Sequence, residues 1–128
     1  MKRQVIAVIL CIGFLLVAVG TPIALARWTH LESITLNISR SSSTITSSTT
    51  ITGQPGTTKI SASYKLEKLV NGNYQSVDTW TASSSSETLF NSRKTTNCTA
   101  GTYKLSVTAT ITRDGTKETV TDSRVKTV

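Results

Sequence analysis

The sequence predicts an all-β fold, an antiparallel β-sandwich of about seven strands over residues 33–128. Apolar and polar residues alternate over short segments, and turn residues separate these segments at intervals of about ten residues. No stretch long enough to form a helix has helical periodicity. The length of 128 residues argues for one such domain.

The first 26 residues have the features of a secretory signal peptide. Lys2 and Arg3 give a basic start, residues 5–19 are apolar, and Ala24-Leu25-Ala26 has the small-residue pattern of a cleavage site. The alternative is a retained membrane anchor. The apolar run is shorter than the roughly 20 residues that a membrane-spanning helix needs, which favours cleavage.

We therefore predict a signal-peptide helix that is cleaved after Ala26, a lead-in over residues 27–32, and a secreted domain over residues 33–128. The protein would contact the membrane only transiently, through the signal peptide. In the exported part, 40 residues are Ser or Thr. This polar composition, low in charge, leaves few side chains suited to catalysis.

Seven segments have the pattern expected of strands: residues 33–38, 44–52, 59–69, 74–80, 87–91, 102–111 and 117–127. The most regular is 102–111, in which apolar residues alternate strictly with Thr, Lys and Ser. Gln54-Pro55-Gly56 predicts a type II turn, while Asn71-Gly72 and Asp114-Gly115 are typical of tight hairpins. Residues 82–86 and 93–100 are predicted to be loops.

Three strands show an irregular pattern. Ile45 and Ile51 are expected to anchor their strand in the core. The pair Ser47-Ser48 between them is expected to allow the strand to change which side chains face the core. Val77 and Trp80 are three residues apart, which predicts a bulge between them or an outward position for one of them. Val120 and Val125 are five residues apart and would point to opposite faces of a regular strand, which predicts a bulge or bend in the last strand.

The alternation also predicts which side chains form the core. Trp80 is expected to be a core residue at the edge of the sandwich and not a ligand platform, because a domain poor in aromatic residues needs its large side chains inside. The predicted core is Leu36, Ile51, Ile60, Tyr64, Leu66, Trp80, Leu89, Tyr103, Leu105, Val107 and Ile111.

Seven strands in about 100 residues is the strand count of an immunoglobulin-like sandwich. The segment Ala100-Gly101-Thr102-Tyr103-Lys104-Leu105 resembles the penultimate strand of immunoglobulin-like and fibronectin type III-like modules, which implies that Tyr103 makes a corner hydrogen bond. Leu105 stands where the second cysteine of antibody-type domains would be. The whole chain resembles uncharacterised small secreted proteins of Gram-positive Firmicutes that carry one such sandwich, a resemblance that implies no activity.

The exported part offers little for catalysis. It has one histidine, His30, and one cysteine, Cys98, far apart in the sequence, so we predict no catalytic, metal or cofactor site and no enzymatic activity. Cys98 cannot form an internal disulfide, although it could pair between molecules. The carboxylates are expected on solvated faces: Glu32, Glu67, Asp78, Glu87, Asp114, Glu118 and Asp122.

The charge balance suggests the kind of partner. The whole chain has 14 basic and 7 acidic residues, and its exported part remains basic, which favours anionic partners such as cell-wall polymers, acidic glycans or membrane headgroups. The basic residues are scattered, which, together with export, disfavours nucleic acid.

Two functional interpretations remain open. The first is an extracellular binding module that contacts a wall polymer, a glycan or a protein through the loops at 82–86 and 93–100. The second is a structural or assembly subunit that adds strands edge to edge, because Thr-rich strands with open edges are templates for augmentation.

Overall fold

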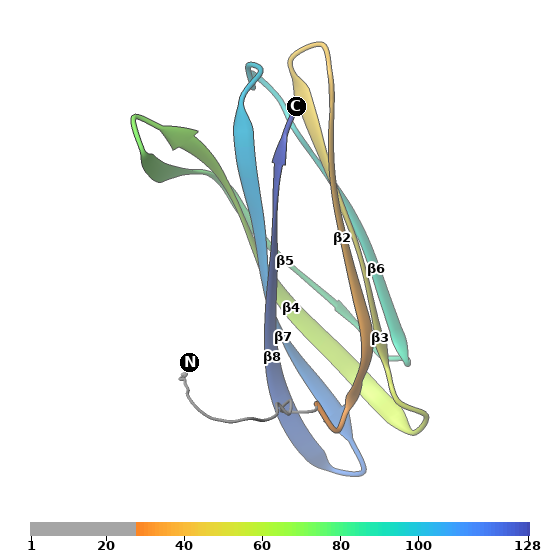
Figure 1. The fold of residues 1–128 in the computed structure, drawn as a ribbon. Coiled ribbons are helices and arrows are strands. Elements are labelled where there is room, and N and C mark those ends of the chain that lie inside the picture. Colours follow the sequence, from red (N-terminus) through yellow and green to blue (C-terminus); the bar gives the residue numbers. More distant parts are fainter. Residues whose placement is uncertain (1–27) are drawn as a thin grey trace.

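The computed structural model of the protein describes residues 28–128. The predicted signal peptide and its cleavage site after Ala26 lie outside these residues. Seven strands make up the fold (Figure 1): β2 (Leu31–Ser41), β3 (Thr44–Gly53), β4 (Thr57–Val70), β5 (Asn73–Ser84), β6 (Thr88–Thr95), β7 (Thr102–Arg113) and β8 (Thr116–Thr127). Within residues 28–128, no helix is long and apolar enough to cross a membrane.

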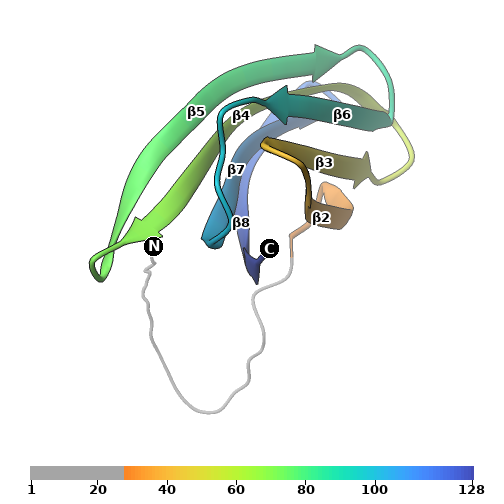
Figure 2. The same ribbon diagram turned by 90° about the horizontal axis from the view of Figure 1, so that it is seen from above.

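The strands form two antiparallel sheets, one with the order β2-β3-β6 and one with the order β5-β4-β7-β8. The sheets face one another, and seen from above the four-stranded sheet curves around the three-stranded one (Figure 2). This confirms the predicted all-β sandwich. The fourth strand, β5, pairs with β4, whereas in antibody constant-type domains the fourth strand joins the other sheet.

The antiparallel pairing gives the sandwich two distinct ends. One end holds the β2–β3 turn, the β4–β5 turn and the β6–β7 loop, and the opposite end holds the remaining three connections. In Figure 1 the β4–β5 turn bends away from the three-stranded sheet. Residues at the same end are therefore neighbours in space even where they are far apart in the sequence.

The core lies between the two sheets, as predicted. Tyr64 is 2% exposed and Leu105 is fully buried, and every other predicted core residue except Trp80 is also buried. Trp80 is half-buried at the β5 edge, where its ring stacks on Tyr64 with 5.4 Å between centroids. Its expected place at the edge of the core is confirmed.

The three predicted turns are also present. Asn71-Gly72 and Asp114-Gly115 both have positive φ at their two residues, the conformation that tight hairpins require. Gly56 has a φ of 96°, and the Thr57 amide donates to the Gln54 carbonyl at 3.1 Å, which closes the turn around Pro55.

The predicted loops at 82–86 and 93–100 are shorter than expected. Strand β5 continues to Ser84 and β6 continues to Thr95, because both pair along their full length with a neighbour. The connections that remain are residues 85–87 and 96–101, and they lie at opposite ends of the sandwich. The two loops therefore do not form one contact surface.

The expected change of facing within β3 is wrong. Ile45, Ser47, Thr49 and Ile51 all point inward and are buried, because β3 pairs with β2 and β6 without a break over this stretch. Thr49 finds a partner in the core, donating to the Tyr64 hydroxyl oxygen at 3.1 Å.

The two predicted bulges have different outcomes. Between Val77 and Trp80 the β4–β5 register is regular, so the second alternative holds: Trp80 points inward and Val77 is exposed. A bulge does occur in β5, but it is at Val77 itself, which a register shift between Leu66 and Glu67 leaves outside the ladder. The bulge predicted in the last strand is wrong, because β8 pairs with β7 in unbroken register. Instead, Val120 points inward while Val125 points outward and is exposed.

Candidate functional site

One end of the sandwich carries many more basic than acidic side chains. At the end that holds the β6–β7 loop, five strands place a basic residue within two positions of their terminus, and the nearest acidic residue is Glu67, which lies opposite Lys104 in the β4–β7 ladder. We call this surface the basic end. It comprises Arg40, Lys68, Lys94, Lys104 and Lys126.

The opposite end has mixed charge. Its turns and strand termini carry three basic residues, Lys59, Arg113 and Lys117, and also four acidic residues: Glu32, Glu87, Asp114 and Glu118. The positive charge of the described chain is therefore concentrated at the basic end. A charge distribution of this kind attracts anionic partners to one side of the molecule.

None of the five side chains of the basic end has an ion-pair partner in the described part of the chain. The ion pair found there joins Arg93 to Asp78 at 2.9 Å, on the side of the sandwich formed by β5 and β6. It lies beside Trp80, whose Nε1 donates to Asn91 Oδ1 at 2.9 Å. The positive charge of the basic end therefore remains available to an external anion.

The β6–β7 loop at the centre of the basic end is held by hydrogen bonds. The Cys98 amide donates to the Ser43 carbonyl at 2.8 Å, and the Tyr103 hydroxyl donates to the Thr99 carbonyl at 2.6 Å. The second contact is the corner hydrogen bond expected for Tyr103. Gly101 is tied to Val128 by a pair of backbone hydrogen bonds of 2.9 and 2.8 Å.

The same loop positions Lys68. The Lys68 ammonium donates to the Thr99 hydroxyl and lies 5.8 Å from the centre of the Tyr103 ring. Gly101 makes room for this side chain, because a Cβ at that position would come within 2.7 Å of the Lys68 Cε. The loop therefore holds the Lys68 side chain in a position from which a larger residue at 101 would displace it.

Besides Lys68, two further cations lie close to Tyr103: Lys126 and Arg40. Lys68 and Lys126 pair with Tyr103 from opposite sides in the β4-β7-β8 ladder, so the three residues form one row on the inward face. Burial raises the pKa of the Tyr103 hydroxyl, and the charge of Arg40 nearby acts against that rise. The open end of the interior is thus lined by Arg40, Lys68 and Lys126.

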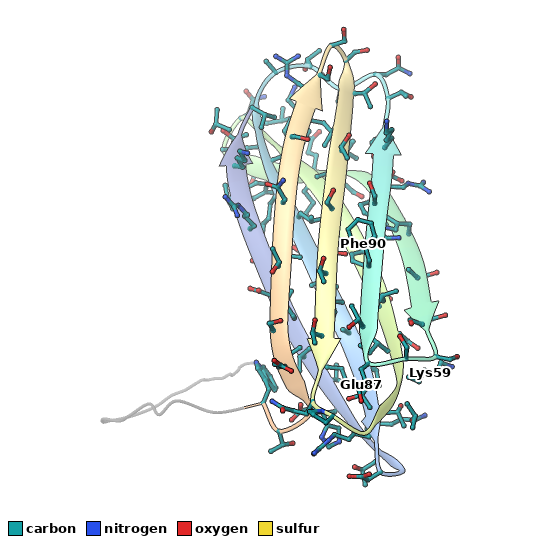
Figure 3. All side chains as sticks on the ribbon, turned by 90° about the vertical axis from the view of Figure 1, so that its right-hand side faces the viewer. Lys59, Glu87 and Phe90 are labelled. Carbon is teal, nitrogen blue, oxygen red and sulfur yellow. The ribbon has the colours of Figure 1, made fainter. Side chains whose placement is uncertain are left out.

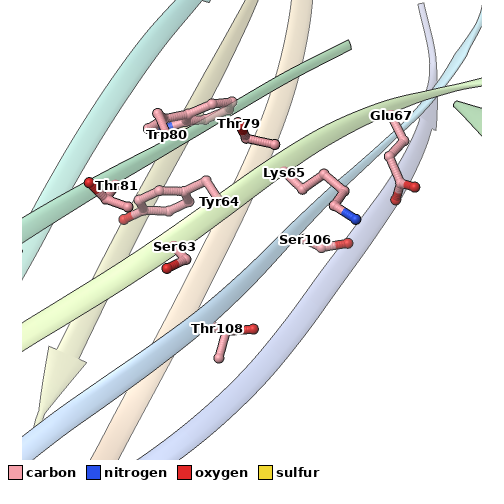
Figure 4. Close-up of a pocket in the computed structure, with 9 residues that line it drawn as sticks. All are labelled: Ser63, Tyr64, Lys65, Glu67, Thr79, Trp80, Thr81, Ser106 and Thr108. Carbon is pink, nitrogen blue, oxygen red and sulfur yellow. The ribbon is translucent and has the colours of Figure 1, made fainter. Parts of the chain in front are cut away.

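A shallow hollow of about 670 Å³ lies on the outward face of the four-stranded sheet (Figure 4). Its floor is lined mainly by hydroxyls, with Lys65 and Glu67 on β4 as its charged groups. Tyr64 and Trp80 alternate with these residues, so their rings belong to the interior. The hollow offers hydrogen-bond donors and acceptors and one charge of each sign.

The structure separates the residues that sequence analysis considered for chemistry. His30 lies at the mixed end, with Nε2 3.0 Å from Thr116 Oγ1, whereas Cys98 is buried in the β6–β7 loop at the basic end. Within residues 28–128, no group of three or more His, Cys, Asp or Glu residues is placed to hold a metal ion. Pairing of Cys98 between molecules would require this loop to open.

Three carboxylates are held in separate places. Glu118 accepts hydrogen bonds from the Thr29 and His30 amides, both at 2.8 Å. Burial opposes ionisation of Glu118, but these bonds outweigh it and lower its pKa. Glu87 accepts from the Gly56 amide at 3.0 Å, and Asp78 pairs with Arg93 as described above.

The basic end could not be recognised from the sequence, because its residues come from five strands and no two of them are adjacent in the chain. The signal that could have located it is the position of each basic residue near one terminus of its predicted strand. Once the strand directions are known, these termini are seen to lie at the same end of the sandwich.

No protein-family model matches the chain, and no curated protein is significantly similar to it.

Proposed function

We propose that this protein is a secreted, non-enzymatic binding module that attaches through its basic end to an anionic polymer or surface outside the cell. The observation that carries this proposal is the concentration of five unpaired basic side chains at one end. Export would follow from the signal peptide predicted at residues 1–26. Charges in a fixed array attract a polyanion more strongly than the same charges scattered over a surface.

The hydrogen-bonded β6–β7 loop supports the same proposal. Hydrogen bonds hold the loop, and ring contacts position Lys68 over Tyr103 and Lys104 over Tyr74, the latter at 5.3 Å from the ring centre. Cations that are already ordered lose less side-chain entropy when they bind. The arrangement therefore suits repeated contact with an extended anionic partner.

Three of the four edge strands carry features that favour binding over assembly by strand addition. β5 is bulged at Val77, and β8 points Asp122 and Arg124 toward the interior. On β2 the Leu36 carbonyl already accepts a hydrogen bond from Arg124 at 3.2 Å. Bulges and inward-pointing charges are devices that keep edge strands from pairing with other chains.

A matched pair of variants tests the proposal. In one, Lys94→Gln and Lys126→Gln remove two charges from the basic end, and in the other Lys59→Gln and Lys117→Gln remove two charges from the mixed end. We expect the first variant to bind immobilised polyphosphate about tenfold more weakly at low salt, and the second to change little. Equal losses in both variants would contradict a defined site.

Fractionation of the producing cells tests location. We expect a polypeptide that starts at Arg27 and is released from the wall fraction by salt. An uncleaved form in the membrane fraction would contradict export, and a cleaved form that stays on the wall at high salt would contradict electrostatic attachment.

A further inference from the structure

Phe90 is the most exposed large apolar side chain of the described residues, at 66%. It projects from β6 on the outward face of the three-stranded sheet (Figure 3). In the register it lies beside Thr50 of β3, which in turn lies beside Thr35 of β2. Phe90 is thus an isolated ring in the middle of a polar sheet face.

The surroundings of Phe90 are almost all hydroxyls. The outward positions of the three strands carry one cation, Lys94, and otherwise neutral polar residues: Ser33, Thr35, Asn37, Ser39, Ser41, Thr44, Thr46, Ser48, Thr50, Thr52, Thr88 and Ser92. Two acidic residues adjoin these positions at the end far from Lys94: Glu32 in the bulge at the start of β2, and Glu87 just before β6 (Figure 3). The face therefore offers one apolar ring, many hydrogen-bonding groups and one positive charge.

Phe90, Ser92 and Lys94 form a row along β6, because alternate residues of a strand point to the same side. The backbone positions of Phe90 and Lys94 are about 14 Å apart along the strand. Lys94 belongs to the basic end, so this row continues the proposed anion-binding surface onto the sheet face.

We propose that the outward face of the three-stranded sheet binds an acidic polysaccharide, with a sugar ring stacked on Phe90 and an anionic group of the same chain at Lys94. This inference rests on the proposed function, since Lys94 is part of the basic end, and it names the partner as a charged glycan. A pyranose ring presents an apolar face of C–H groups to an aromatic ring and hydroxyls at its rim, which matches Phe90 and its neighbours.

The composition of the face argues against other partners. A protein interface concentrates its energy in a cluster of aromatic and aliphatic anchors, and a membrane surface requires a broad apolar band. One ring within a field of hydroxyls provides neither. Charge complementarity with Lys94 selects an acidic glycan over a neutral one.

Two polyanions separate the ring contact from the charge contact. Polygalacturonate carries negative charge on sugar rings, whereas polyphosphate carries negative charge without rings. We expect Phe90→Ala to weaken binding to polygalacturonate about fivefold and to leave binding to polyphosphate unchanged. Phe90→Tyr keeps the ring and is expected to bind both polymers as the unchanged protein does.

Val77→Ala serves as the matched control, because Val77 is also exposed and apolar but lies in the bulge of β5 in the other sheet, outside the basic end. It should leave both affinities unchanged. If Phe90→Ala lowers neither affinity, or lowers both equally, the glycan proposal is wrong while the electrostatic function stands. The same holds if the unchanged protein binds only polyphosphate. If it binds neither polymer at low salt, the proposed function itself fails.

Discussion

The hydroxyl of Tyr103 donates a hydrogen bond to the backbone carbonyl of Thr99, with 2.6 Å between the two oxygen atoms. Tyr103 opens β7, and Thr99 lies four residues earlier in the β6–β7 loop. The contact therefore ties the loop at the basic end to the core beneath it. It serves this role in a domain whose described part contains no disulfide.

Removal of this hydroxyl should lower stability. We expect Tyr103→Phe to reduce the free energy of unfolding by about 1 kcal/mol, because the Thr99 carbonyl loses its partner while the ring keeps its packing. Denaturation in urea measures the change. Tyr74→Phe is the control, since Tyr74 is partly exposed on the sheet face. Equal stability of the Tyr103 variant and the unchanged protein would contradict a structural role for the corner bond.

Acid should destabilise the protein through Asp78 and Glu118. The hydrogen bond from Arg93 lowers the pKa of Asp78 more than burial raises it, and backbone hydrogen bonds lower the pKa of Glu118 despite its burial. A depressed carboxyl pKa contributes stability that is present above the unfolded value, near 4, and is lost as the pH falls through the folded value.

Unfolding measured between pH 7 and pH 2 tests this expectation. The variant with Asp78→Asn and Glu118→Gln should be less stable at pH 7 and should lose less stability on acidification than the unchanged protein. Glu32→Gln changes an exposed carboxylate and should leave the pH profile as it was. A profile with the same slope in all three proteins would show that these two contacts do not set the acid response.

The fold could be predicted from the sequence where one face of a strand is fully buried. Strand β7 is the clearest case, because Leu105, Val107 and Ile111 alternate with polar residues and occupy the centre of the core. The tight turns were predictable for a similar reason, since Asn71-Gly72 and Asp114-Gly115 match the positive φ that their turns need.

Prediction failed where a strand departs from simple alternation of polarity. In β3 the buried positions between Ile45 and Ile51 are Ser47 and Thr49, so polarity gave no guide to their facing. In β8 the inward positions after Val120 carry charge, because the strand forms an open edge. The basic end depends on the directions of several strands and could be seen only after assembly.

The buried Ser47 hydroxyl has no hydrogen-bond partner within the described residues. A buried hydroxyl without a partner keeps the cost of its lost hydration, so Ser47→Ala should raise the free energy of unfolding by about 1 kcal/mol. Thr49→Val is the informative comparison, because Thr49 donates to Tyr64 and its loss should be destabilising. If urea denaturation shows both changes to be destabilising, the Ser47 hydroxyl has a partner in solution.

Arg124 sits on the inward face of the edge strand β8, where it donates to the Leu36 carbonyl of β2 at 3.2 Å. A groove of about 410 Å³ lies there between the two edges. Arg124→Val would extend the apolar inward face beyond Val120 and free the β2 carbonyl, which removes two obstacles to pairing with another chain. We therefore expect this variant to form dimers or larger species at micromolar concentrations at which the unchanged protein stays monomeric.

Sedimentation velocity at several concentrations measures the difference, with Lys117→Val on the same strand as the control. Association of the unchanged protein to the same extent would instead favour the assembly interpretation.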